Sequence, residues 1–94
     1  MTFEFGVFIS TVDGRNAFVA GRCFFGPIAV GAVFTKMRRY FPVPIAEHVP
    51  VELTVKKIVL YSHDVLELDE GLTAELHLEG VIPDGLDHGA VLVG

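Results

Sequence analysis

The sequence predicts an all-β domain whose strands close into a six-stranded barrel. Apolar and polar residues alternate with the period of a β-strand, turn signals recur at short intervals, and no stretch has the periodicity of a helix. A closed barrel is favoured over an open sheet because closure removes the edge strands that would pair with other chains. A β-sandwich is the alternative. At 94 residues, the chain suits one domain over residues 1–94.

Six segments of the chain carry the strand pattern. They cover residues 2–10, 17–25, 32–37, 51–61, 72–79 and 90–93. The fifth is the clearest, because its apolar residues fall on one face and its polar residues on the other. In the fourth, the alternation changes phase at Lys57-Ile58, which a β-bulge with one inserted residue would explain.

Glycine and proline mark the turns between these strands. Asp13-Gly14 predicts a tight hairpin turn, because glycine adopts a positive φ without strain, and Gly26-Pro27 predicts the next turn. Gly21 lies inside the second strand and predicts a bend or bulge where two backbones approach closely. The segment 38–50 contains three prolines, which cannot donate ladder hydrogen bonds, so it is predicted to be a loop or an edge.

The composition indicates a folded protein with an acidic second half. Half of the residues are hydrophobic and a fifth are charged, which excludes a disordered chain. The net charge is −5: residues 1–50 carry five Lys or Arg and three carboxylates, whereas residues 51–94 carry two and nine. Affinity for nucleic acid comes largely from neutralised phosphates, so this balance disfavours RNA. No apolar run is long enough for a membrane span and the start lacks a signal-peptide pattern, so we expect a cytoplasmic protein.

The residue types of catalytic and metal sites are present without the spacing that such sites need. Cys23 is the only cysteine and is predicted to be a small buried thiol. The four histidines show none of the usual metal-ligand spacings. His63-Asp64 has no identifiable nucleophile beside it. The carboxylates Glu67, Asp69 and Glu70 lie in a predicted solvated loop. We therefore expect no enzymatic activity, no metal and no cofactor.

A spaced pattern of glycine and arginine in the first third of the chain resembles a known family. From Gly14-Arg15 through Gly21-Arg22 to Gly26 and Gly31, the spacing is similar without a gap to the G-R-G-x-V-x-x-G-R-x-x-x-G-x-x-x-x-G pattern of domain 2 in elongation factor Tu and related translational GTPases. Later segments also resemble that domain, so the likeness spans nearly the whole chain. The resemblance implies a Greek-key-like barrel of the translation-factor type.

Two departures from the family limit what the resemblance implies. The phosphate-binding pattern G-x-x-x-x-G-K-[ST] is absent, so the chain is not a GTPase and we expect no bound nucleotide. In elongation factor Tu, an acidic pair and an aromatic residue before the G-R-G turn help to hold the aminoacyl end of tRNA. The matching positions here are Val7, Phe8 and Ser10, so that pocket is not reproduced.

The connection between the third and fourth predicted strands is longer than in the family and unusually apolar. Residues Tyr40–Pro50 could plug one end of the barrel or form a contact surface for another protein, and the sequence leaves both interpretations open. We predict a non-catalytic protein-binding barrel that acts as a homo-oligomer or an accessory subunit. The predicted contact residues are Arg38, Arg39, Tyr40, Phe41 and Ile45.

Two other functions are weighed against this prediction. The basic-aromatic cluster of Lys36, Arg38, Arg39 and Tyr40 could bind RNA, which would make the chain an RNA- or ribosome-associated module. Such a small patch neutralises few phosphates, so a solvated strand end is the favoured interpretation. A small-molecule carrier or enzyme that uses the barrel mouth is the remaining class, and no motif supports it.

Overall fold

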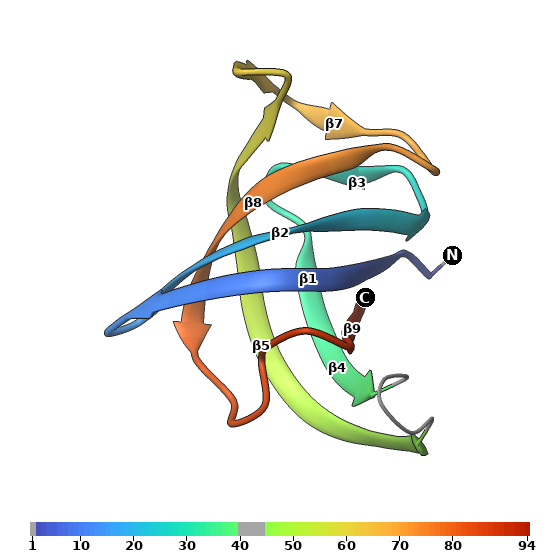
Figure 1. Cartoon of the computed structure of the whole chain (residues 1–94), viewed down its shortest axis with the longest axis vertical. Coiled ribbons are helices and arrows are strands. Elements are labelled where there is room, and N and C mark those ends of the chain that lie inside the picture. Colours follow the sequence, from blue (N-terminus) through green and yellow to red (C-terminus); the bar gives the residue numbers. More distant parts are fainter. Residues whose placement is uncertain (1, 40–44) are drawn as a thin grey trace.

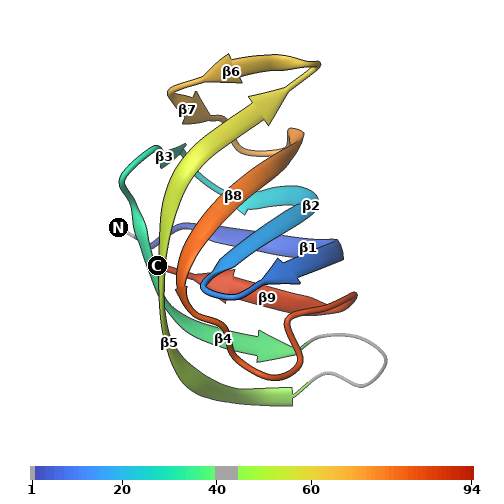
Figure 2. The ribbon, with the colours of Figure 1, turned by 90° about the vertical axis from the view of Figure 1, so that its left-hand side faces the viewer.

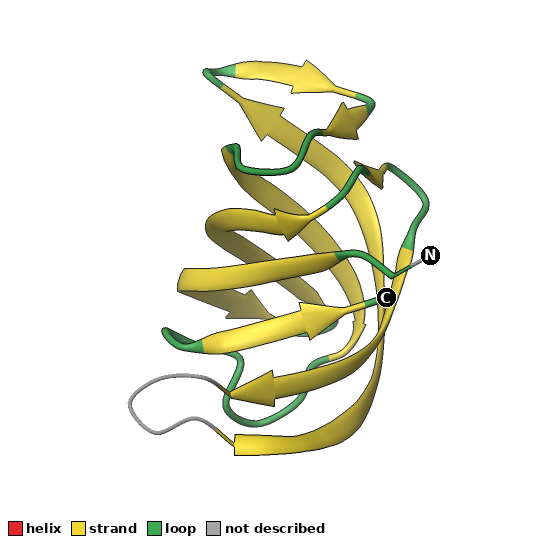
Figure 3. Cartoon of the chain, turned by 90° about the vertical axis from the view of Figure 1, so that its right-hand side faces the viewer, coloured by secondary structure: helices red, strands yellow, loops and turns green. Residues whose placement is uncertain are grey.

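Each of the predicted strand segments is present in the computed structural model, which describes residues 2–39 and 45–94 (Figure 1). The strands are β1 (Glu4–Asp13), β2 (Asn16–Phe25), β3 (Ile28–Ala29), β4 (Val33–Arg39), β5 (Ile45–Leu60), β6 (His63–Val65), β7 (Glu67–Leu68), β8 (Thr73–Val81) and β9 (Ala90–Val93). The described residues contain only strands and loops (Figure 3), and none of them forms a helix that could cross a membrane.

Six antiparallel strands of the described chain form a closed barrel, which confirms the predicted fold class and excludes a sandwich. The strands follow the order β4-β9-β1-β2-β8-β5, and pairing between β4 and β5 closes the ring. β9 comes last in the chain yet lies between β4 and β1, which gives the Greek-key-like connection. The short strands β3 and β7 pair with each other near one end of the barrel, and β6 pairs with the end of β5 (Figure 2).

Apolar side chains from alternate strand positions fill the barrel. Strand β8 alternates between exposed and buried residues along its length, as its sequence predicts. No polar or charged residue of the described chain is buried. The largest fully buried side chains include Phe5, Phe34, Leu53, Leu76 and Leu92.

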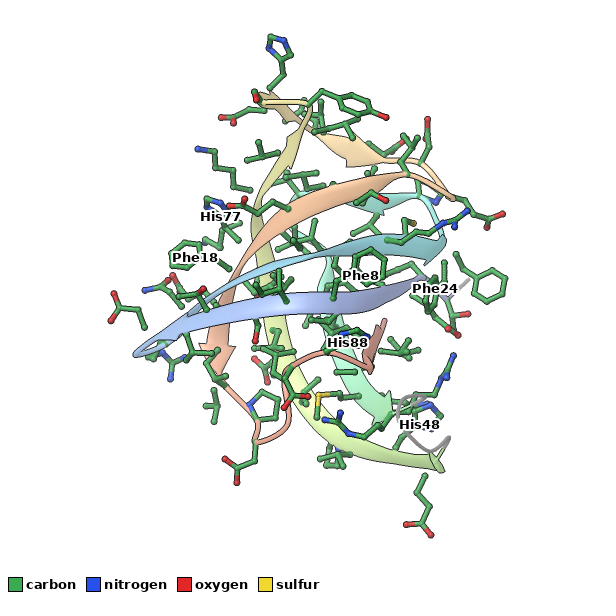
Figure 4. All side chains as sticks on the ribbon, viewed as in Figure 1. Phe8, Phe18, Phe24, His48, His77 and His88 are labelled. Carbon is green, nitrogen blue, oxygen red and sulfur yellow. The ribbon has the colours of Figure 1, made fainter. Side chains whose placement is uncertain are left out.

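Strands β1 and β2 approach each other most closely at a pair of glycines. A Cβ atom on Gly21 would lie 1.9 Å from the carbonyl oxygen of Gly6 and 2.9 Å from Cε2 of Phe5. Register shifts on either side leave Phe8 and Phe24 as extra residues in their strands, both visible along the β1–β2 pair in Figure 4. The predicted close approach at Gly21 is confirmed.

The turn and the second bulge also follow the sequence. Gly14 adopts a φ of 63° in the turn between β1 and β2. In the pairing of β5 with β8, Val55 lies opposite Leu78 and Lys57 opposite His77, so Lys56 is the inserted residue. This insertion is the β-bulge that the change of phase predicts.

Strand β5 corrects one prediction. The fourth strand was predicted to begin at Val51, but β5 begins at Ile45, because residues 45–50 pair with β4. The pairing with β8 starts only at Glu52, so the beginning of β5 is paired on one side. An edge of this kind accommodates Pro50, which has no N–H to donate. Residues 45–50 are therefore an edge strand, which is one of the two predicted alternatives, and the predicted strand start at Val51 was wrong.

Candidate functional site

The predicted contact residues fall at one end of the β4–β5 hairpin. Arg38 and Arg39 are the last residues of β4, and Ile45 is the first residue of β5 and pairs with Arg39. Tyr40 and Phe41 lie outside the described residues. The structure thus brings Arg38, Arg39 and Ile45 together at the end of the barrel that Figure 2 shows at the bottom.

A cavity of about 310 Å³, here named the end cavity, opens beside these residues. Met37 and Val49 lie opposite each other on β4 and β5, and these two apolar lining residues are here called the apolar base of the cavity. Met37 is buried, whereas Val49 is 51% exposed. The connection between β8 and β9, residues 82–89, forms the other side. The full lining is Met37, Arg38, Arg39, Glu47, Val49, Asp84 and Gly85.

Arg39 holds the β8–β9 connection against β4. Its Nη1 donates to Oδ1 of Asp87 at 3.0 Å and to the carbonyl oxygen of His88 at 3.2 Å, and its Nη2 donates to the carbonyl oxygen of Gly85. Two of these three acceptors are backbone carbonyls, so the guanidinium fixes the path of the chain as well as pairing with a charge. Arg39 is therefore a structural part of the end cavity.

Arg38 is also held by an ion pair to another strand of the barrel. Its Nη2 donates to Oε1 of Glu4 at 2.7 Å, and this ion pair is partly buried. It joins β4 to β1 across the intervening strand β9. Both arginines of the predicted contact set thus have carboxylate partners inside the domain.

The lining of the end cavity also contains two acidic residues, Glu47 and Asp84, which are here called its rim. Glu47 and Asp84 contribute carboxylates to the lining, and within the part of the chain that the structure describes neither of them forms an ion pair. The two guanidinium charges are balanced by Glu4 and Asp87. Sequence reasoning emphasised the cations and missed these two carboxylates, because residues 47 and 84 are far apart in the chain and come to line one cavity only in the folded barrel.

A second cavity, of about 340 Å³, lies near the C-terminal end of β2 and has no reactive group among its described lining residues. Arg22, Cys23, Phe24, Glu70 and Gly71 line it. Burial, together with the smaller effect of the nearby negative charges of Glu70 and Asp69, raises the pKa of the Cys23 thiol to about 11. The thiol is therefore protonated at neutral pH and is a poor nucleophile. The prediction of a small buried thiol is confirmed.

One histidine, His77, makes contacts with neighbouring side chains on strands β2 and β8. His77 packs edge-on against Phe18, with ring centroids 4.8 Å apart, and its Nε2 lies 2.8 Å from Oε1 of Glu75 (Figure 4). Phe18 and His77 are directly opposite residues of β2 and β8. Among the residues described, no three His, Cys, Asp or Glu side chains gather closely enough to hold a metal ion. The Phe18–His77 contact is thus a cross-strand pair on the outside of the barrel.

The chain is similar in fold to solved structures of translation elongation factor SelB from Methanococcus maripaludis. The apo form and the complex with the GTP analogue GPPNHP each give a TM-score of 0.73 over 100% of this chain, at 18% sequence identity. The matched part is 19% of the SelB chain, so the present chain spans about a fifth of its length. No protein-family model and no curated protein sequence matches the chain. The predicted likeness to domain 2 of elongation factor Tu is confirmed at the level of the fold.

Proposed function

We propose that this barrel of the translation-factor type is a non-catalytic binding domain that docks a protein partner at the end cavity. The observation that carries the proposal is a cavity of about 310 Å³ with an apolar base, located where the sequence predicts a contact surface. In the SelB structures a barrel of this fold is part of a much longer chain. A barrel that works beside other protein surfaces is consistent with that arrangement.

The exposure of the β5 edge supports docking at this end. Residues 47–50 are all exposed, and β5 is paired on only one side there. An interpretation of Tyr40–Pro50 as a plug requires side chains folded into the barrel, whereas residues 47–50 are exposed. An apolar side chain buried against Val49 and Met37 would contribute about 1.5 to 3 kcal/mol to binding. That is enough for this cavity to act as the central anchor of an interface.

The alternative of an RNA- or ribosome-associated module has support from the fold alone. Its candidate cations, Arg38 and Arg39, have carboxylate partners within the domain, and Glu47 and Asp84 on the same rim would repel phosphates. Affinity for RNA that falls steeply as the salt concentration rises would support the alternative. Absence of RNA binding at low salt would remove it.

Replacing an exposed apolar residue of the end cavity tests the proposal. We expect Val49→Arg to lose the protein partners that the unaltered chain captures from a lysate of its source cells, because the larger charged side chain fills the cavity. Val49 is 51% exposed, so the free energy of unfolding should change by no more than about 0.5 kcal/mol. Affinity purification with mass spectrometry, together with thermal unfolding, measures both effects.

Val81→Arg is the matched control, because Val81 is an apolar strand residue that is 71% exposed and lies outside the end cavity. It should keep the partners that Val49→Arg loses. Alanine at Tyr40 and Phe41, the aromatic members of the predicted contact set, should also weaken capture without unfolding the domain. The same set of partners on the unaltered chain and on Val49→Arg would reject docking at the end cavity.

A further inference from the structure

We infer that the group bound in the end cavity is a lysine or arginine side chain from a basic segment of a different protein. This inference rests on the proposed function and adds the chemistry of the partner. It follows from the charges that remain on the rim after the internal ion pairs are formed, from the size of the cavity and from its apolar base.

The charges of the cavity are unbalanced toward the negative. Arg38 pairs with Glu4 at 2.7 Å and Arg39 pairs with Asp87 at 3.0 Å, so with Glu47 and Asp84 four carboxylates are set against two guanidinium groups. Glu47 and Asp84 form no ion pair within the described part of the chain. A partner that covered these carboxylates without a cation would have to remove water from them at a cost in free energy. A cationic partner provides the missing charge.

The shape of the cavity suits one long basic side chain. A volume of about 310 Å³ is at the lower end of the range for ligand pockets. Met37 and Val49 can pack against an aliphatic stem, and Glu47 and Asp84 line the same cavity. Lysine and arginine bury their methylene groups on apolar surfaces and keep the charged group at a polar edge. The apolar base and the acidic rim therefore match the two parts of one such side chain.

The same charges argue against a second copy of this chain as the occupant. In a two-fold contact through this face, each copy would present Glu47 and Asp84 to the same acidic rim of the other copy. The net charge of −5 adds a general repulsion between copies. A head-to-tail contact through a basic residue elsewhere would fill every cavity only if the contacts closed into a ring. A different, basic protein satisfies the cavity without these penalties.

A peptide titration monitored by nuclear magnetic resonance tests the inference directly. The probe is acetyl-Gly-Arg-Gly-amide, and the comparison peptide carries citrulline in place of arginine, which keeps the shape and removes the charge. We expect the arginine peptide to shift the amide signals of Glu47, Val49 and Gly85, with affinity that falls as salt is added. The citrulline peptide should bind about fivefold more weakly.

Neutral variants identify the carboxylates that carry the effect. The double variant Glu47→Gln with Asp84→Asn should weaken binding of the arginine peptide about fivefold, to the level of the citrulline peptide. The matched control is Asp13→Asn with Glu79→Gln, two exposed carboxylates outside the cavity, and it should bind like the unaltered chain. Equal affinity for both peptides, shifts confined to other surfaces, or no shift at all would overturn the inference. Tighter binding of an RNA oligonucleotide at the same residues would overturn it as well.

The two proposals fail in different ways. If Val49→Arg loses its lysate partner while the double neutral variant keeps it, the end cavity docks a protein but the bound group is not basic. If both variants keep the partner, docking at the end cavity is itself rejected. If both lose it and the double variant also loses the arginine peptide, the two proposals stand together.

Discussion

Two antiparallel strand pairs leave very different room for other molecules. One is the close approach of β1 and β2 at Gly6 and Gly21, here called the β1–β2 crossing. The other is the end of the β4–β5 hairpin beside the end cavity, here called the open end. At the crossing, Gly21 meets the backbone of Gly6 with no space for a Cβ atom, and β2 is covered by β1 on one side and β8 on the other. At the open end, the first residues of β5 pair on one side, and Val49 is half exposed beside a cavity. A strand that is paired on both sides has its backbone groups covered, whereas a strand that is paired on one side leaves an edge exposed. Substitutions should therefore affect folding at the crossing and binding at the open end.

The largest effect is expected at the crossing, from Gly21→Ala. The added Cβ would lie 1.9 Å from the carbonyl oxygen of Gly6, so two backbones would have to separate. We predict a loss of at least about 3 kcal/mol in the free energy of unfolding, measured by urea denaturation.

Gly14→Ala is the control for this prediction. Gly14 has a φ of 63° but nothing within 4 Å of the added Cβ, so its cost comes from backbone strain alone. We expect about 1 to 2 kcal/mol there. Equal losses in the free energy of unfolding for Gly21→Ala and Gly14→Ala would show that β1 and β2 can move apart to accept the added Cβ. The β1–β2 crossing would then be less tightly packed than the comparison with the open end assumes.

An effect of intermediate size is expected at Cys23, on the same strand as Gly21. In the unfolded chain the thiol ionises near its ordinary pKa of 9.0, whereas burial raises the folded pKa to about 11. Between these values the folded state keeps a proton that the unfolded state has lost, so stability falls as the pH rises from 9 to 11. The loss should be on the order of 2 to 3 kcal/mol.

The comparison with Cys23→Ala isolates the thiol, because all other titratable groups are the same in both proteins. The difference in stability between the two should shrink as the pH rises from 9 to 11. A constant difference would mean that the thiol ionises alike in the folded and unfolded states. Unfolding by urea at a series of pH values, in the presence of a reductant, provides the measurement.

The parts of the fold that the sequence predicts are those set by local rules. Strand alternation, the Asp13-Gly14 turn, the close approach at Gly21 and the inserted residue before Lys57 each follow from the period of a strand or from what glycine permits. The start of β5 does not, because three prolines between residues 42 and 50 indicate a break in pairing. A strand paired on one side tolerates Pro50, so the prolines are compatible with both a loop and an edge strand, and the sequence does not decide between them.

The chemistry of the open end was less predictable for a different reason. Arg38 and Glu4 are 34 residues apart, and Arg39 and Asp87 are 48 residues apart, so the ion pairs depend on the order of strands in the closed barrel. The sequence places the two arginines in a basic cluster, and the structure shows that carboxylates from distant segments balance them. Glu47 and Asp84 then set the charge of the rim. The sequence predicts a contact surface at this end of the barrel, but the charge of the groups that line the end cavity follows only from the closed structure.

The smallest effect concerns how the open end keeps its shape. Arg39 donates to Asp87 and to two backbone carbonyls of the β8–β9 connection. The Asp87 side chain is 65% exposed, so the ion pair should contribute little, whereas the carbonyls lose their partner if the guanidinium is removed. We predict that Arg39→Gln costs about 1 kcal/mol and that Asp87→Asn costs less than about 0.5 kcal/mol, both measured by thermal unfolding. Equal costs would assign the effect to the ion pair, and the β8–β9 connection would then be held by a contact that added salt can screen.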